Sequence, residues 1–156
     1  MKKRVVSLML VCAMVLMCAL SFAGCGKKED GKEASTGNSA DFKVGVIHIG
    51  DPADGAGYSY AHDQGIVKMQ KALNLTDDQI VRKINVSDGD AVATRTAIEE
   101  CVNEGCKIIF GTSWGYMDTM EQMASEYPNV VFSHGTGYKS NGKNFNNYFG
   151  RIYQAR

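Results

Sequence analysis

Short apolar runs alternate with longer amphipathic segments from residue 42 onward. The run Lys43–Ile49 is rich in β-branched residues, which predicts a strand. In Tyr60–Leu73, Ile66 and Met69 fall on one face at helical spacing, which predicts a helix. The alternation then continues. We expect further strands at Ile80–Val86, Lys107–Phe110, Val130–Phe132 and Asn147–Gly150, and further helices at Ala91–Glu104, Gly115–Glu126 and from near Ile152.

This order of elements predicts an α/β fold. Short apolar strands separated by helices are typical of a parallel sheet covered on both faces, with right-handed crossovers. Ser87–Asp90 supplies residues that cap a following helix, and Gly105 is placed to end that helix. No further element completes the sheet before Arg156. We therefore expect residues 42–156 to form an incomplete three-layer lobe of a longer protein.

Residues 1–24 have the layout of an export signal. Three basic residues, Lys2, Lys3 and Arg4, precede an apolar stretch that is nearly long enough to span a bilayer, so an uncleaved anchor is the alternative. The stretch ends in Phe22-Ala-Gly-Cys25, which resembles a lipobox, although Phe22 stands where Leu is usual. We expect cleavage before Cys25 and lipidation of its thiol. The mature chain would then be a lipid-anchored protein on the extracytoplasmic face of the cell membrane.

Residues 25–41 contain no large apolar side chain after the cysteine, which predicts a flexible tether. The whole chain has 17 basic and 17 acidic residues, and loss of the three basic residues of the signal leaves 14 and 17, a net charge of −3. A nucleic-acid-binding protein usually carries a basic face, so this balance argues against that class.

The five cysteines do not indicate a disulfide framework. Cys12 and Cys18 belong to the signal and Cys25 is the expected lipid acceptor, so Cys101 and Cys106 remain. These two could pair in an oxidising compartment. Pairing requires close and well-aligned Cβ atoms, and we favour two separate buried thiols.

The loops that follow the predicted strands should carry the ligand site. In an open parallel sheet, ligands bind at the carboxyl ends of the strands. Aromatic side chains there can stack on a planar ligand, and carboxylates and hydroxyls can hold its polar groups. The alternatives are turn formation by the Gly and Asp residues and packing by the aromatics. The predicted ligand-binding residues are Asp51, Asp54, Tyr58, Ser59, Ser113, Trp114, Gly115 and His134.

Catalytic and metal-binding patterns are weak. His48, Asp51, Asp54 and His62 do not match a metal-ligand spacing, so we expect no metal and no cofactor. The run Gly111–Gly115 is not a nucleophile elbow, and the first loop lacks the Lys-Ser/Thr pair of a phosphate loop. An extracytoplasmic hydrolase that uses His134 with Ser113 or Ser133 is the alternative from the enzyme class.

Several segments together resemble the basic membrane protein family of ABC-importer solute-binding lipoproteins, whose known members bind purine nucleosides. The resemblance covers residues 43–156 and includes these segments: Lys43–Ile49, Gly57-Tyr58-Ser59 before Gly65, Ile108–Tyr116, Glu126–Phe132 and Asn147–Ala155.

The resemblance implies a type I periplasmic-binding-protein-like fold, with two α/β lobes that close on a solute, and ABC permease subunits as partners. It implies that Tyr58 stacks on the base and that Trp114 or Tyr116 supplies a second aromatic. Family members often carry Asp directly after the first strand; here Ile49 takes that place and Asp51 follows two residues later. A sensory lipoprotein that presents its ligand to a membrane receptor is the alternative within the binding class.

Overall fold

The computed structural model describes residues 41–151 and residue 154, and every structural statement below concerns these residues. The predicted signal (1–24), the lipid acceptor Cys25 and nearly all of the tether (25–41) lie outside them, as does most of the helix expected from Ile152.

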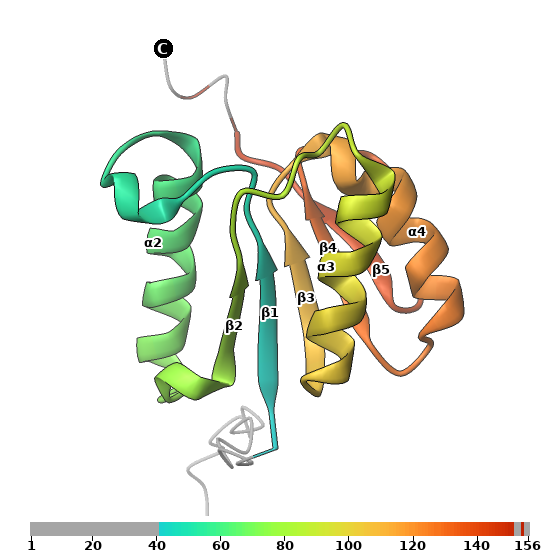
Figure 1. The fold of residues 1–156 in the computed structure, drawn as a ribbon, viewed down its shortest axis with the longest axis horizontal. Helices are drawn as coiled ribbons and strands as arrows, with labels where there is room; N and C mark the ends of the chain where they lie inside the picture. The colour runs from blue at the N-terminus through green and yellow to red at the C-terminus, as the bar shows by residue number, and fades with distance from the viewer. Residues whose placement is uncertain (1–40, 152–153, 155–156) are drawn as a thin grey trace, which may run out of the picture. The chain divides into compact units, whose positions relative to one another are not determined.

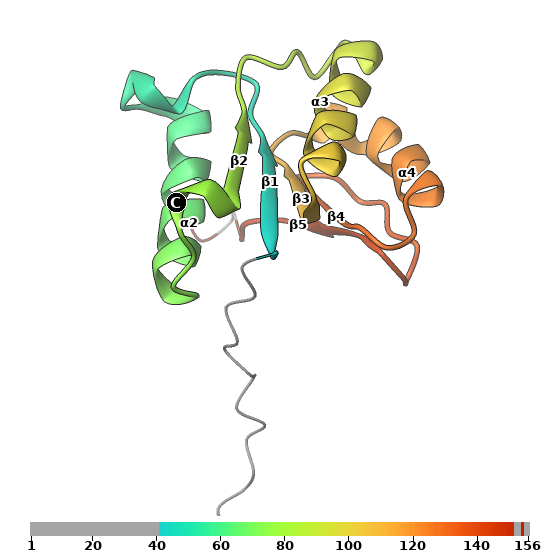
Figure 2. The ribbon, with the colours of Figure 1, turned by 60° about the horizontal axis from the view of Figure 1, so that its bottom comes forward.

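Five parallel strands form one sheet in the order β2-β1-β3-β4-β5. Helix α2 covers one face of the sheet, and helices α3 and α4 cover the other (Figures 1 and 2). This confirms the expected α/β, three-layer arrangement. The strands are β1 Lys43–Ile47, β2 Ile80–Lys83, β3 Cys106–Gly111, β4 Val131–Gly135 and β5 Phe145–Tyr148, and the helices are α2 Gly57–Ala72, α3 Ala91–Asn103 and α4 Met117–Glu126.

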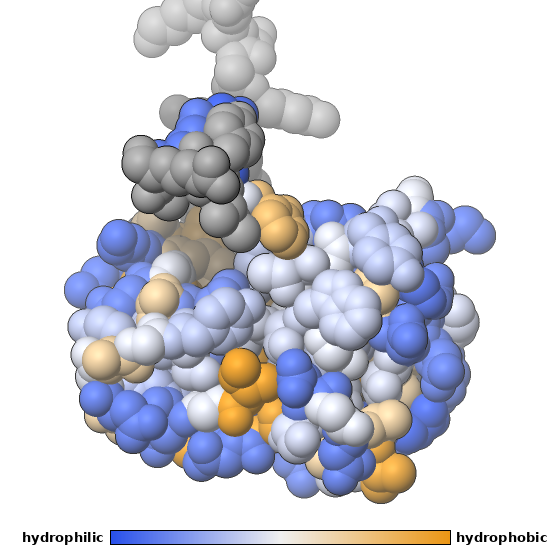
Figure 3. Space-filling model, turned by 90° about the horizontal axis from the view of Figure 1, so that it is seen from above, coloured by the Kyte–Doolittle hydropathy of each residue, from blue (hydrophilic) through white to orange (hydrophobic). Residues whose placement is uncertain are grey.

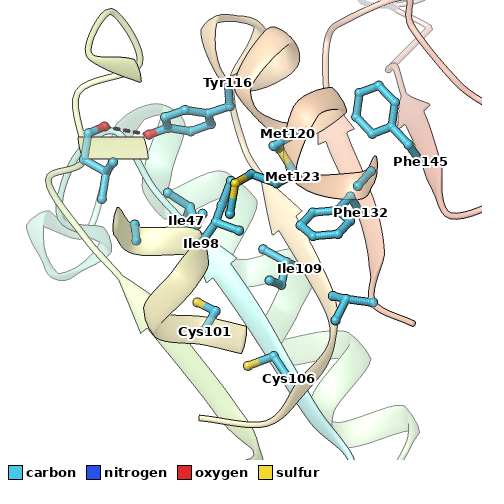
Figure 4. Packing of buried hydrophobic residues seen from close by; sticks show 14 of the residues in the cluster. Ile47, Ile98, Cys101, Cys106, Ile109, Tyr116, Met120, Met123, Phe132 and Phe145 are labelled. Carbon is cyan, nitrogen blue, oxygen red and sulfur yellow. Dashed lines mark hydrogen bonds between the residues drawn. The ribbon is translucent and has the colours of Figure 1, made fainter. Parts of the chain in front are cut away.

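The sheet separates two apolar clusters. The larger one fills the space between the sheet and helices α3 and α4, and it includes Ile47, Ile98, Met120 and Phe132, which are fully buried (Figure 4). The smaller one lies under α2, where Val44, Val46 and Ile66 pack together with Ile80. Alternate residues of β1 therefore face opposite layers, as expected of a central strand that is buried on both faces.

The predicted ends of helix α3 are confirmed. The Asp90 carboxylate accepts hydrogen bonds from the backbone N–H groups of Val92 and Ala93 at 2.9 and 3.0 Å, which satisfies two donors that have no partner within the helix. At the other end, Gly105 has φ +90°, a left-handed conformation that stops the helix at little steric cost.

Several predicted strands differ in their bounds, and β4 runs three residues past its predicted end, to Gly135. Strand β2 ends at Lys83 instead of Val86, and two residues later Asn85 turns the chain with φ +57°. Strand β5 is Phe145–Tyr148, two residues earlier than predicted. Its position is set by Asn144, whose amide donates to three backbone carbonyls at the end of α4 and in the following turn: those of Ala124, Tyr127 and Val130.

Candidate functional site

Large apolar side chains are exposed mainly at one edge of the sheet. Six of the exposed ones follow the carboxyl ends of strands, and we call them the rim: Ile49, Tyr58, Ile84, Trp114, Tyr138 and Phe149. Figure 3 looks onto this edge and shows pale side chains across its middle, an orange patch to one side of them and mostly hydrophilic residues around the periphery. An exposed apolar area with a polar border is typical of an interaction surface. Of the predicted aromatics, Tyr58 follows the carboxyl end of β1 and Trp114 that of β3, at the sheet edge where the loops were expected to gather.

The loop after β1 forms a small hollow at the rim. The Asp51 carboxylate accepts a 2.8 Å hydrogen bond from Ala53 N–H and begins a short 3-10 turn that contains Asp54. Ser59 is buried and accepts a 3.0 Å hydrogen bond from Gly50 N–H, which fixes the loop to the start of α2. A hollow of about 230 Å³ lies between these residues and Tyr58. Ser59 thus shapes the wall of the hollow, and Asp51 and Asp54 supply its acceptors.

The loop after β3 is joined to the loop after β2 through Asp88. Ser113 Oγ donates a 2.5 Å hydrogen bond to Asp88 Oδ2 and accepts a 3.4 Å bond from Gly115 N–H. A Cβ atom on Gly115 would lie 2.5 Å from the Asp88 carbonyl oxygen, so only glycine fits this approach. Trp114 stands between these two residues and is 57% exposed. Its backbone is held on both sides while its indole remains accessible.

Two aromatics were candidates for the second stacking group, and the structure distinguishes them. Tyr116 is fully buried, and its hydroxyl donates a 2.6 Å hydrogen bond to the carbonyl of Val86 (Figure 4). Burial raises the pKa of this phenol above its ordinary value. Tyr116 is therefore part of the core, and Trp114 is the accessible aromatic of this loop.

His134 does not reach the rim surface. It is fully buried, and its ring stacks on Phe145 with a centroid separation of 4.9 Å and an interplanar angle of 24°. Its Nε2 atom lies 3.1 Å from the carbonyl oxygen of Lys139, and Gly137 leaves no room above the ring, because a Cβ there would fall 1.9 Å from it. Access to a ligand would require the covering loop to move.

A charged network lies beneath the first loop. Asp63 on α2 receives a 2.7 Å hydrogen bond from Arg82 Nε, and the same carboxylate oxygen lies 3.4 Å from His48 Nε2. His48 is fully buried, and the cost of burying a charge lowers its pKa below the ordinary value, although Asp63 partly opposes this shift. Across β1, Thr112 Oγ1 donates to the carbonyl of Ile47 at 2.9 Å. These contacts fix the base of the rim.

Sequence reasoning missed three residues that the structure places in or against the rim. Asp88 was interpreted as part of a turn, and its pairing with Ser113 spans 25 residues. His62 and Tyr148 lie beside Tyr58 in a row of rings, although Tyr148 follows 86 residues after His62. No local pattern marks such contacts. Only the general rule that strand ends meet at one sheet edge could have suggested them.

Within residues 41–151, no group of three His, Cys, Asp or Glu side chains is arranged to hold a metal ion. In the same stretch, no helix has the length and apolar character that a membrane span requires.

The sequence matches proteins of one transport family. The family model described as "ABC transporter substrate-binding protein PnrA-like" matches residues 42–156. A purine-binding protein of Brucella abortus is 36% identical over 114 residues, which is 73% of this chain and 31% of that protein. A putative ABC transporter glucose-binding protein of Haloferax volcanii is 34% identical over 124 residues, 80% of this chain and 29% of that protein. The chain thus spans about a third of the length of these curated relatives.

Solved structures share the fold. An ABC transporter solute-binding protein from Conexibacter woesei superposes with a TM-score of 0.54 at 18% identity, over 69% of this chain and 35% of that one. A transcriptional activator of the comK gene from Bacillus halodurans superposes with a TM-score of 0.56 at 20% identity, over 67% of this chain and 33% of that one. At these identities the likeness concerns the fold alone. The family match over residues 42–156, together with the two relatives above 30% identity, shows that the chain belongs to the PnrA-like family of ABC transporter substrate-binding proteins.

Proposed function

We propose that the protein captures a purine nucleoside or a related planar solute outside the cell and delivers it to an ABC importer. The observation that carries the proposal is the pair of accessible aromatics, Tyr58 and Trp114, at the carboxyl edge of a parallel sheet. Aromatic faces provide contact area for a planar base, and nearby acceptors can hold its hydroxyls or amines.

The hollow beside Tyr58 suits a hydroxylated or amino-bearing ligand. Asp51 and Asp54 line it together with the Tyr58 ring, so apolar area and hydrogen-bond acceptors lie next to each other. In this proposal the described lobe supplies one wall of the site and a second lobe supplies the other. Closure then buries the solute between them. The match to only about a third of each relative's length is consistent with a single lobe.

The contacts do not favour a hydrolase. Ser113 Oγ donates a hydrogen bond to Asp88, and Ser133 Oγ donates one to Asn146. The ring of His134 is enclosed by Phe145 and Gly137. A nucleophile and its base must lie within hydrogen-bond reach of each other. The hydrogen bonds of these serines go to other residues and not to His134.

The solute class can be tested directly on purified full-length protein. Mass spectrometry of the ligand released on denaturation identifies what is carried through purification, and calorimetric titration with adenosine, guanosine, adenine and glucose ranks the classes. We expect a purine compound to bind at least about tenfold more tightly than glucose, a difference of about 1.4 kcal/mol. Binding of glucose alone would overturn the proposal in favour of a sugar receptor, and turnover of the bound compound would overturn it in favour of an enzyme.

We also propose that Cys25 carries a lipid that holds the protein at the extracytoplasmic face of the membrane. The sequence Ala23-Gly24-Cys25 after an apolar stretch supports this. Two or more acyl chains give stable anchoring where one gives only marginal binding. Labelled palmitate should enter the native protein and not the Cys25→Ala variant. Equal labelling of both would contradict lipidation at this residue.

A further inference from the structure

A row of rings runs from the rim into the side of the sheet. The ring of Tyr58 lies 4.5 Å from that of His62, at an interplanar angle of 54°. The His62 ring lies 6.1 Å from that of Tyr148, and Tyr148 meets the edge of Phe110 at 6.3 Å and 72°. The row therefore connects α2 with β5 and β3, and its first member is the rim aromatic that we propose to stack on the ligand.

The inner end of this row is firmly placed. The hydroxyl of Tyr148 lies 3.5 Å from Nδ1 of His62, and burial raises the pKa of that phenol to about 12. Gly135 on β4 permits the approach, because a Cβ there would lie 3.1 Å from the same hydroxyl. The ring of Tyr148 on β5 thus lies against Gly135 of β4 and Phe110 of β3, and it can fix the position of the imidazole.

The outer end of the row is not buried. Tyr58 is 44% exposed and is the second residue of α2, where the helix begins. His62 lies four residues later, one turn further from the rim and on the same helix face. An exposed aromatic side chain that becomes fixed only when the ligand arrives loses rotamer freedom on binding, which weakens affinity. A neighbouring ring that already restricts it removes part of that loss.

We propose that His62 is a positioning residue: its imidazole, held by Tyr148, orients the Tyr58 ring for stacking on the ligand without contacting the ligand itself. This inference rests on the proposed function, since it assigns how one wall of that site is preorganised. It adds a residue that stands outside the predicted ligand-binding set.

Affinity measurements separate positioning from direct contact. In full-length protein titrated with adenosine, His62→Ala should weaken binding about three- to tenfold, the effect of freeing one side chain at a binding surface. In a Tyr58→Ala background the same change should have less than about a twofold effect, because the ring that it positions is gone. A full, additive loss in that background would show that His62 contacts the ligand and would overturn the proposal.

Three further variants guard against a general structural defect. His62→Phe keeps a ring beside Tyr58 and should restore affinity to within about twofold of the native value. Tyr148→Ala removes the ring that packs against the imidazole and should weaken binding in the same direction as His62→Ala, again only when Tyr58 is present. Lys68→Ala, an exposed change on the same helix, is the control for helix stability and should leave affinity unchanged. Failure of His62→Phe to restore binding would contradict positioning by the ring.

A readout without ligand keeps this test independent of the solute. Tyrosines can be replaced by 3-fluorotyrosine, and the ¹⁹F signal of Tyr58 is assigned by its loss in Tyr58→Phe. His62→Ala should narrow this signal, because the ring moves more freely, whereas His62→Phe and Lys68→Ala should not. An unchanged line width in His62→Ala would overturn the positioning role. If adenosine does not bind the native protein but the line narrows, the proposed ligand is wrong and the positioning of Tyr58 still stands.

Discussion

Gly115 lies directly against the backbone of Asp88, so closely that a Cβ atom would stand 2.5 Å from the Asp88 carbonyl oxygen. The Asp88 carboxylate also accepts a hydrogen bond from the Ser113 hydroxyl. Both neighbours of Trp114 are therefore fastened to a single residue of another loop, and the indole is the part of this turn that remains free to meet a ligand.

Gly115→Ala should destabilise the protein by about 1–3 kcal/mol, because the loops after β2 and β3 must separate to admit the methyl group. Denaturant unfolding measures this. Gly89→Ala is the matched control in the adjoining turn, since the nearest neighbour of a Cβ there is 4.0 Å away. Equal stability of the two variants would contradict the close approach.

Trp114→Ala should weaken adenosine binding more than about tenfold, because a stacked aromatic at a buried site contributes more than about 1.4 kcal/mol. The unfolding midpoint should stay near the native value, since the indole is 57% exposed. Calorimetry of the full-length protein is the measurement. Leu73→Ala, an exposed apolar residue at the far end of α2, serves as the control and should bind normally. An unchanged affinity in Trp114→Ala would remove this residue from the site.

Tyr116→Phe should cost about 1–3 kcal/mol of stability, since it leaves the Val86 carbonyl without its 2.6 Å donor inside the protein. Denaturant unfolding of Tyr116→Phe and of Tyr138→Phe gives the comparison, because Tyr138 is 72% exposed. The same stability for both variants would show that the buried hydroxyl contributes nothing.

The free energy of unfolding should decrease as the pH falls below about 6.5, the ordinary pKa of histidine. Burial lowers the pKa of His48 in the folded protein, and that of His62 as well, so the unfolded chain takes up protons first and is favoured in acid. The stability that these neutral histidines contribute is fully present above the ordinary histidine pKa. It is lost as the pH falls toward their lowered pKa values in the folded protein. Unfolding at about pH 7.5 and about pH 5.5 should show a smaller difference in His48→Gln than in the native protein. The same change in stability between the two pH values in both proteins would show that His48 does not contribute to the loss of stability in acid.

Cys101 and Cys106 should be unreactive toward a maleimide in the native protein and should react once it unfolds. Both are buried and free, and the pKa of the Cys101 thiol is raised by its hydrogen bond with Cys106 and by burial. Burial denies the reagent access to both thiols, and because the thiolate is the reactive form, the raised pKa of Cys101 opposes its modification further. Labelling at native conditions that matches the rate for a free thiol would contradict this packing.

Most of the fold follows from local pattern. Helix α3 was predicted almost to the residue because its ends carry their own signals, the carboxylate of Asp90 and the left-handed Gly105. Strand β5 has no comparable signal. Its residues are FNNY, without β-branched side chains, and its register depends on Asn144 reaching carbonyls 14 to 20 residues earlier. Such a contact exists only after the chain has folded, so periodicity could not place it.

The site was predictable in outline and not in detail. Placing Tyr58 and Trp114 at the carboxyl edge needed only the topology of a parallel sheet. The depth of His134 depends on how the loop from Gly137 closes over it, and the partner of Ser113 depends on the path of a different loop. His134 was expected in a loop and lies in strand β4, where it is buried, whereas Trp114 follows β3 and remains exposed.

The direction of β1 has a consequence for delivery. The strand starts at Lys43 on the edge opposite the rim, so the polypeptide enters the lobe at the end of the sheet that lies away from the rim (Figure 1). With a lipid on Cys25, residues 25–41 would form the tether between the membrane and the lobe. These 17 residues can extend to at most about 60 Å. That reach exceeds the roughly 17 Å height of β1 several times over. If the proposed lipid anchor and transport function hold, the tether is long enough for the rim to face a permease in the membrane while Cys25 stays inserted.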